Sequence, residues 1–225
     1  MPPVLNKHLL LGVTGSIAAY KAADLASKLA QAGALVDAIL TPAAEKFVAP
    51  LAFQSVTGRR AFTDADLWGS ESHVLHVGLA QEADALVIAP CTANTLAKLA
   101  HGLADNLLTV TALEAACPLL LAPAMESHMF AHPATQDNLA ALAKRGVTIV
   151  GPAEGRLPRG AADLGGCWSL PTCSATCASS SDGEAGWPLK RFWSPPEGLA
   201  SRLTRCASCP TARRAGRATR WRRLR

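Results

Sequence analysis

The residues best suited to chemistry follow the first apolar run of the chain, in the turn Thr14-Gly15-Ser16. A helical pattern is expected from Ser16 onward, so the chain must reverse direction within a few residues, which glycine backbone freedom permits. The free N–H groups, the dipole and a hydroxyl at a helix start suit an anion such as phosphate. The Gly12-x-x-Gly15 spacing matches neither the dinucleotide fingerprint nor the P-loop. This turn therefore predicts only that a phosphorylated ligand binds here.

Apolar and amphipathic segments alternate along the first 150 residues. Several of the apolar runs have no polar alternation, which is typical of strands covered by helices on both faces. Regular alternation of this kind predicts an α/β fold: a doubly wound, flavodoxin-like or Rossmann-like parallel sheet with helices on both faces. The expected strands are 8–13, 34–41, 85–90, 117–125 and 147–152, and the expected helices are 16–32, 43–57, 92–101, 105–115 and 134–145.

Polar residues follow these predicted strands at the edge where a parallel sheet binds its ligands. Besides the first turn, these are Thr41, Pro42 and Ala43, then Thr92, Ala93, Asn94 and Thr95, and then Ala124, Met125 and Glu126. Each turn alone could equally be a helix cap, since Ser, Thr and Asn are common at that position. Four such turns at one sheet edge favour a site for a phosphorylated ribityl or ribose group.

The composition of the chain changes near residue 157. Residues 1–156 hold ten Lys or Arg against thirteen Asp or Glu, a net charge of −3, whereas residues 157–225 hold twelve against four, a net of +8. We expect two parts: one domain of ordinary size over 1–156 and an Arg-, Cys- and Trp-rich tail over 157–225 that lacks apolar periodicity and is disordered.

Three interpretations of the tail stay open. The pairs Cys173–Cys177 and Cys206–Cys209 are compatible with zinc, but the first pair is loosely spaced and little around it predicts a fold, so we expect no metal site. The arginine run is compatible with electrostatic binding of nucleic acid. We favour the third hypothesis, that the tail is a frameshifted translation of a GC-rich gene, and we therefore expect no nucleic-acid partner.

The rest of the chain predicts a cytoplasmic protein. We find neither a secretory signal nor an apolar run long enough to cross a membrane. Only two cysteines, Cys91 and Cys117, occur in residues 1–156, as expected of reduced thiols.

A series of short motifs occurs in a recognisable order: GSIAAYKAADLASKL, TPAAEKFV, FQSVTG, HVGLAQEADALVIAPCTANTLAKLAHGLADNLLT, PAMESHMF and HPATQDNLAALAKRG. Together, over about residues 8–156, they resemble the flavin-containing cysteine decarboxylases, and most closely the phosphopantothenoylcysteine decarboxylases of coenzyme A biosynthesis. The resemblance implies FMN, a small phosphorylated cysteine conjugate as substrate, and a homotrimer with FMN between subunits.

The resemblance also assigns roles. His76 matches the active-site histidine. His73, three residues earlier, does not match it. The other histidines are expected to be structural: His8, His101, His128 and His132. Glu126 and Met129 match substrate-binding positions. The cofactor-binding positions are Gly15, Ser16, Ile17, Thr41, Pro42, Ala43, Thr92, Ala93, Asn94, Thr95 and Ala124.

In the implied reaction FMN takes hydride from the thiol-bearing carbon, CO2 leaves, and a cysteine on a mobile flap supplies a proton as the electrons return. His76 would act as base or orienting group near the carboxylate.

Two positions depart from the family pattern. Glu126 stands where an asparagine usually binds the substrate carboxylate, and two carboxylates repel unless one is protonated. The flap segment has Leu157, Pro158, Arg159 and Gly160 where the cysteine is expected. These departures, and the absence of a ligase sequence, keep two alternatives open: an FMN-binding flavoprotein without turnover, and a related flavin prenyltransferase or peptidyl-cysteine decarboxylase.

Overall fold

The computed structural model describes residues 4–68, 74–151, 153–156 and 162–166. Its main sheet has six strands in the order β3-β2-β1-β4-β5-β6, and every neighbouring pair is parallel. This order winds outward in both directions from β1 and β4, as in a Rossmann sheet. The strands are β1 (His8–Val13), β2 (Leu35–Leu40), β3 (Ala61–Phe62), β4 (Ala85–Cys91), β5 (Leu119–Pro123) and β6 (Thr148–Ile149).

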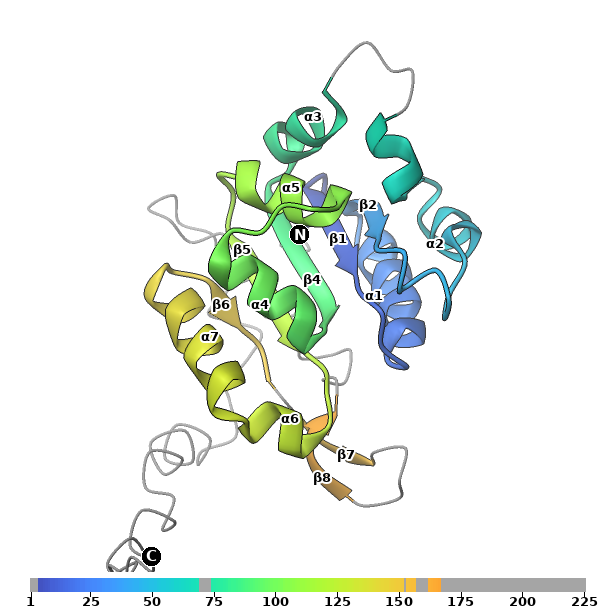
Figure 1. Ribbon diagram of the computed structural model, residues 1–225. Helices are drawn as coiled ribbons and strands as arrows, with labels where there is room; N and C mark the ends of the chain where they lie inside the picture. The colour runs from blue at the N-terminus through green and yellow to red at the C-terminus, as the bar shows by residue number, and fades with distance from the viewer. Residues whose placement is uncertain (1–3, 69–73, 152, 157–161, 167–225) are drawn as a thin grey trace, which may run out of the picture. The chain divides into compact units, whose positions relative to one another are not determined.

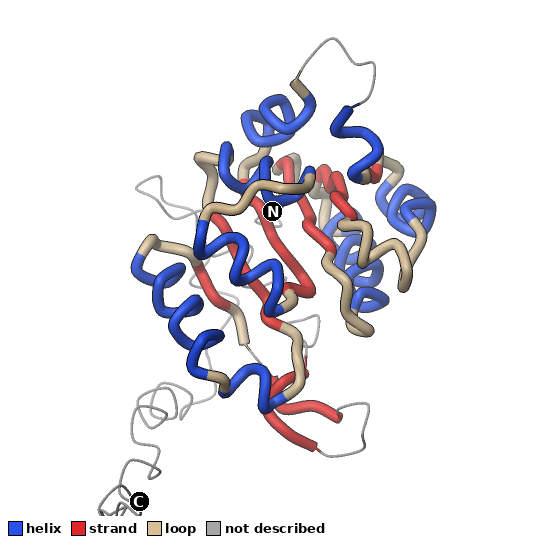
Figure 2. The backbone as a smooth tube through the Cα atoms, viewed as in Figure 1, coloured by secondary structure: helices blue, strands red, loops and turns tan. Residues whose placement is uncertain are grey.

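Helices connect these parallel strands and lie on both faces of the sheet (Figures 1 and 2). Helices α1 and α2 pack against each other, and α4 packs against α7 on the opposite face, where Figure 1 draws it in front of the sheet. The helices are α1 (Ala19–Gln31), α2 (Pro50–Thr57), η1 (a 3-10 turn, Asp64–Trp68), α3 (Leu75–Glu82), α4 (Ala93–His101), α5 (Leu107–Glu114), α6 (Ser127–Ala131) and α7 (Pro133–Lys144).

Burial of the central strands explains their unbroken apolar sequence. All seven residues of β4 are buried, and Leu10, Ile39 and Leu121 of neighbouring strands are fully enclosed in the same core. A sheet covered on both faces removes the need for a polar face, so the strands show no alternation. The predicted α/β fold with a doubly wound parallel sheet is confirmed.

Several element boundaries differ from those expected. Helix α1 begins at Ala19 instead of Ser16, because Ser16 and its neighbours form tight turns: Ser16 N–H donates to Thr14 O at 2.9 Å and Ala19 N–H donates to Ser16 O at 2.9 Å. Helix α2 begins at Pro50, after a series of turns that was expected to be helical.

A separate antiparallel pair, β7 (Ala153–Arg156) and β8 (Ala162–Gly166), follows the main sheet. Strand β8 falls within the segment for which no regular structure was expected. The four tail cysteines considered for zinc lie outside the described residues. None of the helices in the described ranges combines the length and apolar composition needed to cross a bilayer.

Candidate active site

A pocket lies where the strand order reverses, between β1 and β4. Helices leave these two neighbouring strands toward opposite faces, so a crevice opens beyond their carboxyl ends. The cavity volume is about 570 Å³, within the range usual for small-ligand sites. Its walls are formed by Gly15, Ser16, Thr41, Pro42, Ala43, Asp64, Thr92, Ala93, Asn94, Thr95, Lys98, Asp105, Asn106, Ala124, Met125 and Met129.

The turn after β1 packs closely against the turn after β2. A Cβ atom placed on Gly15 would lie 2.4 Å from Ala43 Cβ and 2.9 Å from the Ala43 carbonyl carbon. Only a glycine allows this approach. Among the described residues, the backbone N–H groups of Gly15, Ile17 and Ala43 have no acceptor, so the two turns offer free donors for an anion.

Threonine hydroxyls hold these turns in place. The buried Thr14 hydroxyl donates to Pro90 O at 2.7 Å and accepts from Thr92 N–H at 3.0 Å, which links the ends of β1 and β4. The Thr41 hydroxyl, 3.3 Å from Val13 O, links β2 to β1 in the same way. These two hydroxyls therefore fix the positions of the turns that form the pocket wall.

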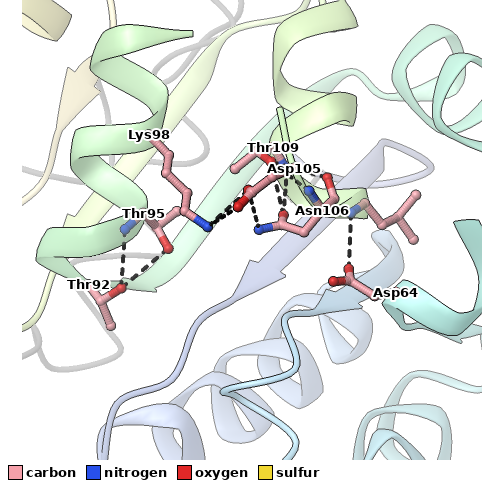
Figure 3. Close-up of polar contacts among 8 residues, drawn as sticks. Asp64, Thr92, Thr95, Lys98, Asp105, Asn106 and Thr109 are labelled. Carbon is pink, nitrogen blue, oxygen red and sulfur yellow. Dashed lines mark hydrogen bonds and ion pairs between the residues drawn. The ribbon is translucent and has the colours of Figure 1, made fainter. Parts of the chain in front are cut away.

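Helix α4 points its first turn at the pocket. The Thr92 hydroxyl is 3.4 Å from Thr95 N and 3.3 Å from the Thr95 hydroxyl, so Thr92 is the N-cap that was considered from the sequence (Figure 3). The N–H groups at the start of a helix lack intrahelical acceptors. Ala93 and Asn94 contribute two of them, and the exposed Asn94 side chain lines the cavity beside them.

Charged residues that were not predicted from the sequence form another part of the wall. Lys98 Nζ lies 2.6 and 2.9 Å from the two carboxylate oxygens of Asp105 (Figure 3). This ion pair lowers the pKa of Asp105, chiefly through the hydrogen bond from Lys98. Asn106 caps α5 in a reciprocal pair with Thr109, a signal that the sequence Asn-Leu-Leu-Thr already contains.

Asp64 reaches the same wall from η1. Its Oδ1 accepts the Leu107 N–H at the start of α5 at 3.0 Å, across 43 positions of sequence (Figure 3). Burial raises the pKa of the Asp64 carboxyl, and the nearby Asp105 charge acts in the same direction. No sequence pattern indicated this contact, because it depends on how η1 packs against α5.

Three predicted site residues are absent from this pocket wall. Ile17 is exposed beside the first turn, Glu126 is the N-cap residue of α6 without a capping hydrogen bond, and His76 lies half-buried in the first turn of α3. His73 lies outside the described residues. The other predicted site residues all line the pocket, including Ala124 and the half-exposed Met129.

The histidines that were expected to be structural have local partners in two cases. His8 Nε2 lies 2.9 Å from the buried Asp37, which also binds Arg59 at 2.7 Å. His132 accepts the Ala134 N–H at the start of α7.

Neither described cysteine can serve as a thiol of this pocket. Cys91 is fully buried, and burial raises its pKa to about 12. Cys117 is half-buried, burial raises its pKa, and it does not line the cavity. Among the described residues, no three His, Cys, Asp or Glu side chains are grouped so as to hold a metal ion.

The family of the chain follows from comparison with known proteins. A family model described as Flavoprotein matches residues 3–167. The chain belongs to the Flavoprotein family. The match continues past residue 156, the boundary suggested by composition, through strand β8.

Curated relatives in this family are longer than the chain. The coenzyme A biosynthesis bifunctional protein CoaBC of Bacillus subtilis is 44% identical over 155 residues, which are 69% of this chain and 38% of that protein. The CoaBC protein of Mycobacterium tuberculosis strain H37Rv is 46% identical over 153 residues, 68% of this chain and 36% of that protein. The chain thus spans little more than a third of the curated relatives it matches.

Solved structures of two other proteins share the fold. A cysteine-to-serine mutant of PPC decarboxylase, in complex with pantothenoylaminoethenethiol, is 34% identical with a TM-score of 0.69, covering 76% of this chain and 96% of that one. The FMN binding protein AtHal3 is 32% identical with a TM-score of 0.69, covering 80% and 100%.

Proposed function

We propose that this chain binds FMN in the crevice between β1 and β4 and decarboxylates phosphopantothenoylcysteine to phosphopantetheine, a step of coenzyme A biosynthesis. The observation that carries the proposal is the convergence of three turns, 14–16, 41–43 and 92–95, on one cavity of suitable size. These are the turns in which family resemblance places the cofactor. CoaBC and PPC decarboxylase are among the relatives that match over the same region.

The residues of the pocket fit FMN. The close approach of Gly15 to Ala43 and the free N–H groups of the two turns form a neutral cradle for a phosphate, and the first turn of α4 adds donors and a favourable dipole. Ser16 and Asn94 supply a hydroxyl and an amide. Ala124, with its small side chain, leaves room for a flat ring beside the end of β5.

FMN would supply a hydride acceptor for the thiol-bearing carbon of the substrate. The protein groups would bind and orient the substrate and would transfer protons. His76 is the proposed base or orienting group at the substrate carboxylate, and Glu126 and Met129 are proposed substrate contacts. Because Glu126 would repel the substrate carboxylate, its side chain is expected to turn away from that group and to contact the substrate elsewhere.

A homotrimer accounts for the position of His76. In one chain His76 does not line the pocket, so a neighbouring copy is the proposed source of the histidine at each site. Multi-angle light scattering on the FMN-loaded protein tests this: a mass three times that of the 23.4 kDa chain is expected, and a monomer that binds FMN and releases CO2 from substrate would contradict it.

We further propose that the reaction stops after CO2 leaves. The sequence has no cysteine between Cys117 and Cys167, and the described thiols do not reach the pocket. Without a thiol from the flap segment or from the described residues to return a proton, the chain would release CO2 once for each bound FMN and leave the flavin reduced. The relative bound to pantothenoylaminoethenethiol is itself a cysteine-to-serine mutant.

Anaerobic mixing with substrate tests this form of the proposal. Stoichiometric loss of the oxidised-flavin absorbance, with equal CO2 and no phosphopantetheine, is expected. Repeated turnover would show that another group donates the proton, whereas binding of FMN without any bleaching would favour the alternative of a flavoprotein without turnover.

Two related activities form the second alternative, because FMN-dependent cysteine decarboxylases such as SpaF also share the fold at 33% identity. Two other substrates would distinguish these activities. Decarboxylation of a peptide with a C-terminal cysteine would indicate a peptidyl-cysteine decarboxylase, and transfer of a prenyl group from a prenyl phosphate to the flavin would indicate a flavin prenyltransferase.

The division at residue 157 remains a proposal. We propose that residues 1–156 form the FMN-binding domain, that 157–225 is a frameshifted tail, and that the chain acts in the cytoplasm without binding nucleic acid. Re-reading the nucleotides after codon 156 in the other two frames tests the frameshift, since a coherent flap with a cysteine is expected in one of them.

A further inference from the structure

The two carboxylate oxygens of Asp64 differ in their contacts: one is hydrogen-bonded within the protein and the other is not. Oδ1 accepts the Leu107 N–H at 3.0 Å and so caps α5 from a distant part of the chain. Oδ2 has no hydrogen-bond partner among the described residues, although Asp64 is half-buried and lines the pocket. This oxygen faces the cavity, where a bound ligand can replace water as its donor.

The cation of the described pocket wall, Lys98, makes no hydrogen bond to Asp64. Lys98 directs its ammonium at both oxygens of Asp105, at 2.6 and 2.9 Å, and Asp105 also accepts from Asn106 Nδ2 at 3.2 Å. Lys98 is thereby paired with Asp105, and it acts on Asp64 only through its charge, which lowers the pKa of Asp64. The donor that Asp64 lacks would therefore come from whatever occupies the cavity.

We propose that Asp64 is a cofactor-binding residue whose Oδ2 accepts a hydrogen bond from the bound flavin. This inference rests on the proposed function, and it adds a residue that neither the strand-end turns nor the family motifs indicate. FMN offers two kinds of donor, the imide N–H of its ring and the hydroxyls of its ribityl chain. A carboxylate is an acceptor for either, and charge-assisted bonds are the stronger kind.

The burial of Asp64 agrees with this assignment. Desolvation raises the pKa of its carboxyl, and the Leu107 N–H and the charge of Lys98 offset only part of this effect. A second donor from the ligand would stabilise the charged form in the occupied pocket.

Asp64→Asn separates cofactor binding from helix capping. The asparagine oxygen can still accept the Leu107 N–H, while the amide nitrogen presents a donor where the pocket needs an acceptor. We expect Asp64→Asn to keep the thermal midpoint of the apoprotein and to bind FMN about tenfold or more weakly, measured by quenching of flavin fluorescence. Asp64→Ala loses the cap as well, so its midpoint should also fall.

Asp66→Asn is the matched control from the same 3-10 turn. Asp66 binds Arg60 and Thr63 and does not line the pocket, so its loss should leave FMN affinity unchanged. Asp64→Asn with the affinity of the wild type would overturn the inference and leave Asp64 as a helix cap only.

Flavin analogues provide a test that needs no variant. With the wild-type protein, 3-methyl-FMN lacks the ring donor, and FMN analogues missing one ribityl hydroxyl each lack the others. Weaker binding of one analogue identifies the donor and supports the inference, and equal binding of all of them contradicts it. If the wild type and Asp66→Asn bind no FMN either, the proposed function fails; if both bind it and Asp64→Asn binds it equally, only this inference fails.

Discussion

Replacing Gly15 by alanine should weaken FMN binding or lower the stability of the protein, although it adds only one methyl group. The added methyl group would lie 2.4 Å from Ala43 Cβ, 2.9 Å from Ala43 C and 3.0 Å from Ala43 O. Non-bonded carbon atoms normally stay about 3.5–4.0 Å apart. Two of the blocking atoms belong to the backbone, so the turn after β2 must retreat by about 1 Å.

The energetic consequence follows from overpacking. Forcing an extra methyl group into a filled space costs about 1–3 kcal/mol. If the turns separate to relieve the clash, this cost falls on the arrangement that binds phosphate, and the FMN dissociation constant should rise about 5- to 150-fold. If they do not separate, the same cost appears as lost stability.

Titration calorimetry with FMN and urea unfolding of the apoprotein measure both quantities. Gly78→Ala is the matched control: no atom lies within 4 Å of the added Cβ, and the position is in helix α3. It should bind FMN normally and gain about 0.5–1 kcal/mol of stability from the higher helix propensity of alanine.

Wild-type affinity together with wild-type stability in Gly15→Ala would refute the reasoning. Such a result would mean that the turns 14–16 and 41–43 are not in close contact or do not hold the phosphate.

Three further predictions concern other parts of the structure. Ser16→Ala and Asn94→Ala should each raise the FMN dissociation constant about tenfold with little change in the thermal midpoint, as fluorescence titration would show; unchanged affinity in both would move the phosphate elsewhere. Cys91, with a pKa raised to about 12, should resist alkylation at pH 8 until denaturant is added, which peptide mass spectrometry can follow; rapid native labelling would contradict its burial. Asp66 and Asp84 have pKa values below their usual value of 3.8, so their stabilisation is present above about pH 4 and is lost as pH falls through the lowered values; Asp66→Asn should flatten the acid limb of a pH–stability curve, and an unaltered limb would argue against its ion pair.

Strands were predictable where burial imposes a long apolar run. The segment Ala85–Cys91 is buried along its whole length, so its sequence alone indicated a central strand. Strand β3 has two residues, Ala61–Phe62, and is held by pairing with β2, which leaves no periodic signal. The start of α1 was placed three residues early because turns and a first helical turn carry similar small and polar residues.

The site was predictable only where it follows directly from strand ends. Residues such as Ser16 and Asn94 sit at positions that any parallel sheet brings together. Asp64 reaches the pocket through a tertiary contact with Leu107, and Lys98 lies on a helix surface that would ordinarily face solvent. Pairings of that kind depend on how helices pack, which neither motif nor periodicity contains.

FMN titration into the purified full-length chain, followed by gel filtration with absorbance read at protein and flavin wavelengths, tests the central claim most directly. The account predicts that flavin co-elutes with the protein at one FMN per chain and that less flavin co-elutes with Ser16→Ala and with Asn94→Ala. Flavin that elutes separately from a folded, colourless protein would contradict the assignment of the crevice between β1 and β4 as an FMN site.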